Sequence, residues 1–176
     1  STLSGPTPSG LLCNGELMKV LVVCQYYHPE PFAVTDVCEE LVRRGHQVTV
    51  LTGLPNYPEG RVPAEYRRRK HRHELRNGVE IWRSWEVGRG AGPMRRLANY
   101  VSFLVSGSVR ALRLADDFEV VLVYQLSPVT MAIPGLAYGR KNRRPVLIYC
   151  LDLWPASLSA GGVNSTSAFY RAVGAL

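Results

Sequence analysis

Short apolar runs alternate with polar loops and amphipathic segments along most of the chain. Residues 20–24 form the first run, and after a proline-rich loop residues 34–44 place apolar side chains at helical spacing. Arg43, Arg44 and Gly45 mark the end of this predicted helix, because cations and a left-handed glycine are frequent there. Residues 48–51 complete a strand–helix–strand unit. Because its strands are apolar throughout, the unit predicts a parallel sheet covered on both faces.

The remaining pattern extends this unit into an α/β domain. Asn77-Gly78 is a hairpin signal, so the basic run 67–76 is expected on a loop or an edge strand, before a third strand at 79–85. Further strands are predicted at 118–124 and 145–150, and further helices at 94–116 and 129–140. The predicted fold class is therefore α/β, a Rossmann-like doubly wound parallel sheet with strand order 3-2-1-4-5. Ligands of such sheets bind where the order reverses, between the first and fourth strands.

The predicted helix 94–116 mixes apolar side chains with arginines, including Arg95 and Arg96. Packing on the sheet, with the arginines in water, is the main role that this pattern predicts. A basic amphipathic helix can also lie on an anionic membrane surface. Under that second interpretation Arg95 and Arg96 face the membrane, together with Arg67 and Arg68 of the basic run.

The charge is unusual, with 21 Lys and Arg against 14 Asp and Glu, a net +7. Such a surplus indicates an anionic partner or simply a basic surface in water. The run 67–76 is either a charged edge that discourages pairing with other chains or a binding surface. Nucleic acid is not expected as its partner, because neither aromatic platforms nor a recognition helix accompany the run.

The cysteines and the chain ends give weaker information. Of four cysteines, none has CxxC spacing, and Cys24 and Cys150 lie in predicted buried strands, which indicates reduced core residues of a cytosolic protein. Residues 1–17 lack the cations of a signal peptide and are interpreted as a non-native leader before residues 18–176. The chain ends inside a helix predicted to begin near 165–167, so a truncated domain is expected.

Polar and aromatic side chains follow several of the predicted strands, where a site is expected. Asp152 is the carboxylate at the end of an otherwise apolar strand, and could orient or deprotonate a hydroxyl, or else cap the following segment. His28 is a weaker candidate, since the prolines beside it could simply hold a rigid turn. The remaining predicted substrate contacts are Tyr26, Glu30, Asn56, Tyr57, Tyr124, Gln125, Ser127 and Trp154.

Several well-known site motifs are missing. The chain has no GxGxxG fingerprint after its first strand, no GxxxxGK[ST] loop and no GxSxG elbow. It has no HExxH and no paired cysteines either, so no metal site is predicted. These absences disfavour a dinucleotide-dependent epimerase or dehydrogenase.

Four segments, MKVLVVCQYYHPEPF, LTGLPNYPEG, VYQLSPVTMA and LDLWP, resemble the amino-terminal half of glycosyltransferase family 4 enzymes. The resemblance is strongest to the bacterial branch that builds O-antigen, capsule and colanic-acid polysaccharides. It implies the GT-B architecture, two Rossmann-like domains that face each other across a cleft. The chain departs from many members by having His28 and Glu30 between prolines instead of a Gly-Gly pair, and Tyr124-Gln125 instead of a histidine.

The resemblance also implies an activity. Such enzymes transfer a sugar with retention from a nucleotide donor, UDP- or GDP-linked, without a cofactor or bound metal. The amino-terminal domain supplies the acceptor side, and the carboxyl-terminal donor domain is absent here, so this chain is expected to be inactive alone. The expected acceptor is a saccharide on a polyprenyl diphosphate, at the anionic cytoplasmic surface of the membrane. The alternative is a free-standing basic module that binds phosphorylated ligands or nucleic acid.

Overall fold

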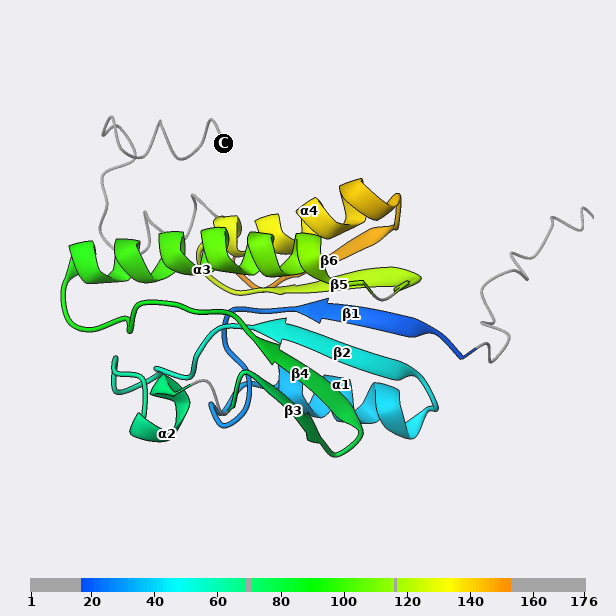
Figure 1. Cartoon of the computed structure of the whole chain (residues 1–176), viewed down its shortest axis with the longest axis horizontal. Helices are drawn as coiled ribbons and strands as arrows, with labels where there is room; N and C mark the ends of the chain where they lie inside the picture. The colour runs from blue at the N-terminus through cyan, green and yellow to red at the C-terminus, as the bar shows by residue number, and fades with distance from the viewer. Residues whose placement is uncertain (1–16, 69–70, 116, 153–176) are drawn as a thin grey trace, which may run out of the picture.

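Six strands form a single sheet with the order β3-β4-β2-β1-β5-β6 (Figure 1). The computed structural model describes residues 17–68, 71–115 and 117–152. All neighbouring strands are parallel except β3 and β4. The predicted order is confirmed, with the antiparallel edge strand added. The strands are β1 (Lys19–Val23), β2 (Gln47–Thr52), β3 (His73–Arg76), β4 (Val79–Arg83), β5 (Val120–Gln125) and β6 (Val146–Cys150).

The turn between β3 and β4 is the hairpin that the sequence predicts. Asn77 and Gly78 have φ angles of 47° and 80°, and both positive angles are what a tight two-residue hairpin turn requires. Gly45, after the first helix, also lies in the left-handed region, at φ 94°.

Helices cover both faces of the sheet. Helix α1 (Val34–Arg43) packs on one face, where Val34 and Cys38 contact Val20, Val22 and other strand residues. Helices α3 (Pro93–Arg113) and α4 (Ile133–Asn142), with the short η2 (Val129–Ala132), lie on the other face. Residues of β1 alternate between the two cores, as the two-residue period of a strand requires. A four-residue helix, α2 (Ala64–Arg67), was not predicted.

The long helix packs on the sheet as predicted, and the structure shows which of its faces does so. The buried residues of α3 are Asn99, Phe103, Gly107 and Ala111. A Cβ on Gly107 would lie 3.1 Å from Pro134, so small residues let α3 approach α4 closely on this side. The larger aliphatic residues therefore face outward as an exposed row, called the α3 stripe: Met94, Leu97, Val101, Val105, Val109 and Leu112.

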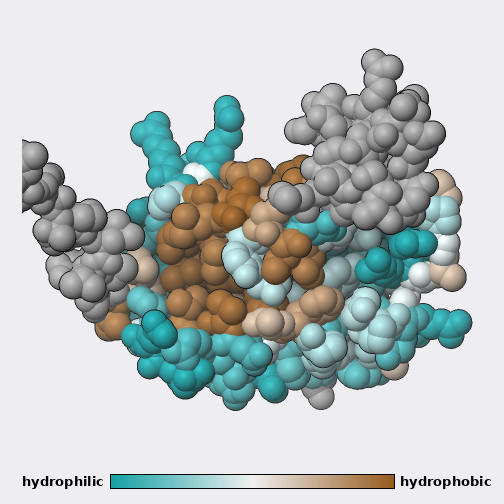
Figure 2. All heavy atoms as spheres, turned by 180° about the vertical axis from the view of Figure 1, so that it is seen from behind, coloured by the Kyte–Doolittle hydropathy of each residue, from teal (hydrophilic) through white to brown (hydrophobic). Residues whose placement is uncertain are grey.

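The prediction that every strand is buried on both faces fails at β6. Residues Leu147, Ile148 and Tyr149 are about half exposed, and Cys150 is exposed too, unlike the buried Cys24. Leu147 and Tyr149 are in register with Leu122 and Tyr124, on the face of the sheet that α1 covers, and among the described residues α1 packs there over β1, β2 and β4. Figure 2 shows the resulting apolar patch on the side away from the viewer of Figure 1.

None of the helices in the described part of the chain is long and apolar enough to cross a membrane.

Candidate functional site

The loops that follow the strands gather at one end of the sheet, on the left in Figure 1. They follow β1, β2, β4, β5 and β6, and α3 begins at the same end. This is the edge where ligands of doubly wound sheets bind. The candidate functional site therefore lies at this edge.

Glu30 joins the loop after β1 to the loop after β2. Its Oε1 accepts hydrogen bonds from the backbone N–H groups of Asn56, at 2.8 Å, and Tyr57, at 2.6 Å. Its Oε2 accepts a third from the N–H of Tyr27, at 3.2 Å. Burial raises the pKa of the Glu30 carboxyl to about 7, although these backbone donors act in the opposite direction. Glu30 therefore fixes the shape of both loops.

Three aromatic rings lie on top of this junction. The ring of Tyr26 stacks on that of Phe32 with centroids 5.4 Å apart, and Tyr57 lies 5.3 Å from Phe32 and 6.1 Å from Tyr26. Tyr26 is almost fully buried, whereas the Tyr57 side chain is 40% exposed. Tyr57 is thus the most exposed ring of this group.

A buried polar cluster lies beneath the rings, around Glu86. Gln25 Nε2 donates to Glu86 Oε2, at 3.2 Å, and to Asn99 Oδ1, at 2.9 Å. Asn56 Nδ2 donates to Glu86 Oε1, while Asn56 Oδ1 accepts from the N–H of Arg89. Burial raises the pKa of Glu86 well above its usual range, while the hydrogen bonds with Gln25, Asn99 and Asn56 act in the opposite direction. The cluster links the loops after β1, β2 and β4 to α3.

Sequence reasoning missed Glu86 and Asn99. Both are polar and lie among apolar neighbours, so their types alone predict exposure. The available signal was a carboxylate just after a predicted strand, the same signal that singled out Asp152.

The second group of predicted residues lies at the ends of β5 and β6. The rings of Tyr124 and Tyr149 are 5.6 Å apart on adjacent strands. Gln125 is buried, and its Nε2 donates to the backbone oxygens of Leu126, at 2.7 Å, and Asp152, at 3.0 Å. Gln125 therefore holds the segment of Asp152 in place. The side chains of Ser127 and Asp152 are partly exposed at this edge.

Other predicted residues lie apart from these two groups. His28 lies in a separate hollow with Tyr66 and Arg76. Arg95 and Arg96 are exposed in the first turn of α3, and Arg67 and Arg68 are exposed on and after α2, across the sheet. Trp154 lies outside the described residues.

The predicted contact residues fall into two groups that differ in solvent exposure. Tyr26, Glu30, Asn56 and Gln125 are buried and shape the loops. Tyr57, Ser127 and Asp152 present surface to a ligand. Across the residues that the structure describes, no three His, Cys, Asp or Glu side chains are grouped so that they could hold a metal ion.

Comparison with known proteins gives a family and a fold. Residues 32–175 match the family model described as a glycosyl transferase 4-like domain. Among solved structures, the chain is similar to CalG4, the calicheamicin glycosyltransferase, with a TM-score of 0.53 and 16% identity, over 90% of this chain and 39% of CalG4. It is also similar to the C-terminal domain of a hydrogenase from Pyrococcus furiosus, with a TM-score of 0.50 and 15% identity, over 84% of this chain and 98% of that domain. No curated protein matches.

The structural matches support the fold alone. At 16% and 15% identity, a glycosyltransferase and a hydrogenase domain share this α/β architecture, so the architecture does not by itself specify a reaction. The likeness to CalG4 confirms the Rossmann-like class seen in GT-B enzymes. The chain spans 39% of the length of CalG4.

Proposed function

The chain belongs to the glycosyl transferase 4-like domain family, and on this premise we propose that it is the acceptor-side half of a retaining glycosyltransferase. The donor is a nucleotide-sugar, UDP- or GDP-linked, held mainly by a carboxyl-terminal domain beyond this chain. The acceptor is a saccharide on a polyprenyl diphosphate, in the synthesis of a bacterial surface polysaccharide. The enzyme works at the cytoplasmic face of the plasma membrane.

The carboxyl edge of the sheet suits the acceptor role. The Tyr57 ring offers an exposed flat surface to a sugar, and Asp152 carries a carboxylate at the same edge. Glycosyl transfer passes through an oxocarbenium-like state, and the departing diphosphate can itself take the proton of the acceptor hydroxyl. Asp152 therefore needs to orient that hydroxyl rather than to act as a strong base.

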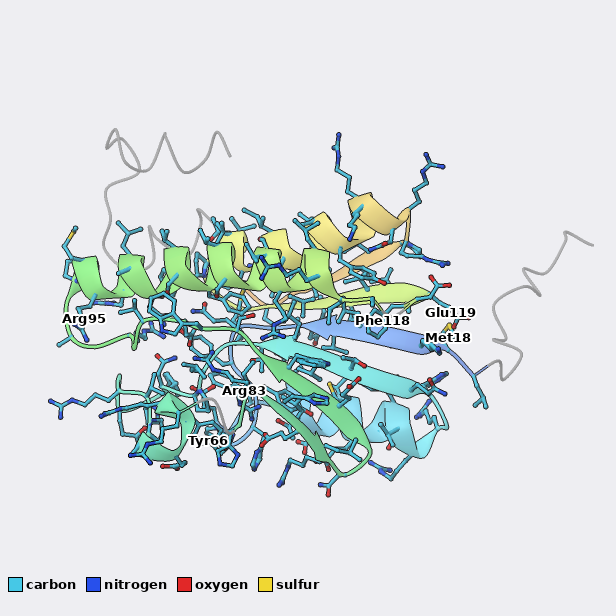
Figure 3. The ribbon with its side chains drawn as sticks, viewed as in Figure 1. Met18, Tyr66, Arg83, Arg95, Phe118 and Glu119 are labelled. Carbon is cyan, nitrogen blue, oxygen red and sulfur yellow. The ribbon has the colours of Figure 1, made fainter. Side chains whose placement is uncertain are left out.

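The observation that carries the membrane part of the proposal is the α3 stripe. Met94 is 74% exposed, Leu97 54%, Val101 48% and Val105 54%, at the spacing of one face of a helix. Arg95 and Arg96 lie in the first turn of the same helix, and Figure 3 labels Arg95 at the site end of the molecule. Exposed apolar side chains on a helix whose first turn carries cations fit an anionic bilayer surface, where each cation near the surface contributes about 1 kcal/mol.

The sequence gives two interpretations of α3, packing on the sheet and contact with a membrane, and these concern different faces of the helix. The face with Phe103 and Ala111 packs on the protein, and the α3 stripe is left for the membrane. Because the helix begins at the same end as the site, binding through its first turns brings the site close to lipid-linked saccharides.

The test is sedimentation with vesicles. The chain should bind vesicles of phosphatidylglycerol and phosphatidylcholine more tightly than vesicles of phosphatidylcholine alone, and added salt should weaken this binding. The double variant Arg95→Glu/Arg96→Glu should bind at least about tenfold more weakly, because two favourable cations are replaced by anions. Arg113→Glu, at the far end of the same helix, is the control with a smaller expected effect.

Two results would refute membrane docking through α3. One is binding that does not depend on salt or on anionic lipid. The other is equal weakening by the charge reversals at both ends of the helix, which would indicate a general effect of net charge.

A further inference from the structure

A hollow of about 390 Å³ lies outside the site described above, between α2, the β3–β4 hairpin and the loop after β1. Its walls include His28, Tyr66, His71, Glu74 and Arg76. Three of these belong to the basic run 67–76, for which the proposed glycosyl transfer has no use. The volume is within the range of small-molecule sites.

Arg83 lies buried behind this hollow and is fully shielded from solvent. Its Nη2 donates to the backbone oxygen of His28, at 2.6 Å, and lies 2.7 Å from Glu74 Oε1. Its guanidinium carbon lies 5.1 Å from the centre of the Tyr66 ring (Figure 3). A buried guanidinium is costly unless it is paired; Glu74 supplies the opposite charge, and the remaining guanidinium donors are left to be explained.

Several buried polar atoms near the hollow have no hydrogen-bond partner within the described residues. Within the described residues, Arg83 Nε and Nη1, Arg76 Nε and His28 Nδ1 are buried and have no hydrogen-bond partner. Arg76 Nε lies 3.9 Å from the carboxylate of Glu39, too far for a hydrogen bond. Buried polar atoms are normally satisfied in folded proteins, and two of these atoms, Arg76 Nε and His28 Nδ1, belong to residues that line the hollow, which indicates a missing partner there.

The carboxylate of Glu74, which lines the hollow, is already paired with other side chains. Glu74 pairs with Arg83 through Oε1 and faces His71 through Oε2, at 3.4 Å. Burial lowers the pKa of His28, the charges of Arg76 and Arg83 lower it further, and Glu74 and Glu39 act in the opposite direction. Arg76, on the wall of the hollow, has a 3.9 Å contact with Glu39 and can pair with an anion.

We propose that this hollow binds a small molecule that carries a phosphate or carboxylate group, of about the size of a charged monosaccharide. His28 and Arg76 contact the oxyanion, and Arg83 stabilises its charge from behind the Tyr66 ring. The site is separate from the carboxyl-edge residues Tyr57 and Asp152, and it does not depend on whether the chain takes part in glycosyl transfer.

The test measures binding to the whole chain by calorimetry and by the ring signals of its histidines in NMR. Glucose 6-phosphate and glucuronate are the two charged probes, and glucose is the neutral one. Saturable binding of either charged probe, with shifts of the His28 and His71 signals and no saturable binding of glucose, supports the proposal. The better charged probe shows whether phosphate or carboxylate is preferred.

Matched variants distinguish binding at this site from a general effect of the net charge of the chain. Arg76→Gln should weaken binding of the better probe about tenfold or more, because it removes a charge-assisted donor. Arg113→Gln removes the same charge on an exposed part of α3 and should change affinity less than about twofold. Arg76 is partly exposed, so its replacement should leave the thermal unfolding midpoint nearly unchanged.

Three results would overturn the proposal. The first is the absence of saturable binding by both charged probes. The second is equal weakening by Arg76→Gln and Arg113→Gln. The third is a preference for a single-stranded oligonucleotide that Arg67→Gln weakens as much as Arg76→Gln does, because that pattern indicates a nucleic-acid surface.

Discussion

At the scale of single residues, two buried carboxyl groups connect the loops of the candidate site. Glu30 and Glu86 are 5% and 2% exposed, and burial is the largest cause of the raised pKa of each. The charge of Glu30 also raises the pKa of Glu86. Because the pKa of Glu30 is raised to about 7, its charge changes near neutral pH, which ties the geometry of the loops to pH.

We expect the stability of the chain to reflect the raised pKa of Glu30. A carboxyl whose pKa is raised to about 7 on folding stabilises the fold below its unfolded value of about 4.5, and this contribution is lost as pH rises through 7. Relative to a Glu30→Gln variant, the wild-type chain should lose about 3 kcal/mol of unfolding free energy between pH 4.5 and 8. Urea unfolding across this range measures the difference.

The control for this measurement is Glu59→Gln, which alters an exposed carboxylate in the neighbouring loop. Its difference from the wild type should stay nearly constant with pH. A wild-type chain that gains stability over Glu30→Gln as pH rises would show that the three backbone donors outweigh burial.

Asp152 is the residue on which the transfer reaction is expected to depend most in this half. In the proposed glycosyltransferase, Asp152→Asn should lower kcat by about 100-fold or more if the carboxylate orients the acceptor hydroxyl. Its circular dichroism and thermal midpoint should stay close to those of the wild type, since the contacts described for Asp152 come from its backbone oxygen. Unchanged turnover would remove Asp152 from the site.

Residue types predicted part of the candidate site. Proline-rich loops after apolar strands were enough to select Tyr26, Glu30, Asn56 and Tyr57, which the structure brings together. The same reasoning could not show that Glu30 and Asn56 are buried, or that Glu86 and Asn99 join them, because burial depends on which loops meet in space. It also could not separate His28 from its neighbours in the same loop.

At the scale of elements, the packing of α4 on the sheet depends on a glycine. A Cβ on Gly135 would lie 2.6 Å from Val123 Cγ2 and 3.3 Å from Val121 Cγ1. Gly135→Ala should therefore destabilise the chain by about 1–2 kcal/mol, although alanine favours a helix. Arg140→Ala, exposed in the last turn of α4, should stay within about 0.5 kcal/mol.

Chemical unfolding of the two variants measures this difference. Equal stability of Gly135→Ala and the wild type would mean that α4 can move away from β5 at little cost.

The periodicity of the sequence predicted the elements better than their orientation. Alternating runs and turn residues were sufficient for the strand order, the hairpin at Asn77-Gly78 and the end of α1 at Gly45. The sequence predicted that α3 packs on the sheet but not which face does so, because its aliphatic residues outnumber the small ones and hydrophobicity alone favours burying them. Close approach to Pro134 at Gly107 decides the orientation instead.

At the scale of the whole molecule, exposed apolar surface and positive charge occur together. The net charge of +7 accompanies the α3 stripe, with Arg95 and Arg96 in the first turn of its helix. The hollow beside Arg83 lies on the other side of the sheet, near α2. Two anionic partners of different size, a bilayer and a small molecule, can therefore be bound by different faces of one domain.

The membrane proposal makes a final prediction about activity. In the transferase that contains this chain, Leu97→Gln/Val101→Gln should raise the apparent KM for a polyprenyl-diphosphate-linked acceptor in anionic vesicles at least about tenfold. The reason is that burying each such side chain in the interface contributes about 1–2 kcal/mol to surface binding, which concentrates enzyme and acceptor together. The same variant should turn over a short-chain, water-soluble acceptor as fast as the wild type, because the stripe is not part of the site. Leu136→Gln, a similar change on exposed α4, should affect neither substrate. Equal losses on both acceptors would show that the stripe supports the fold or the site itself, and that membrane docking through α3 is wrong.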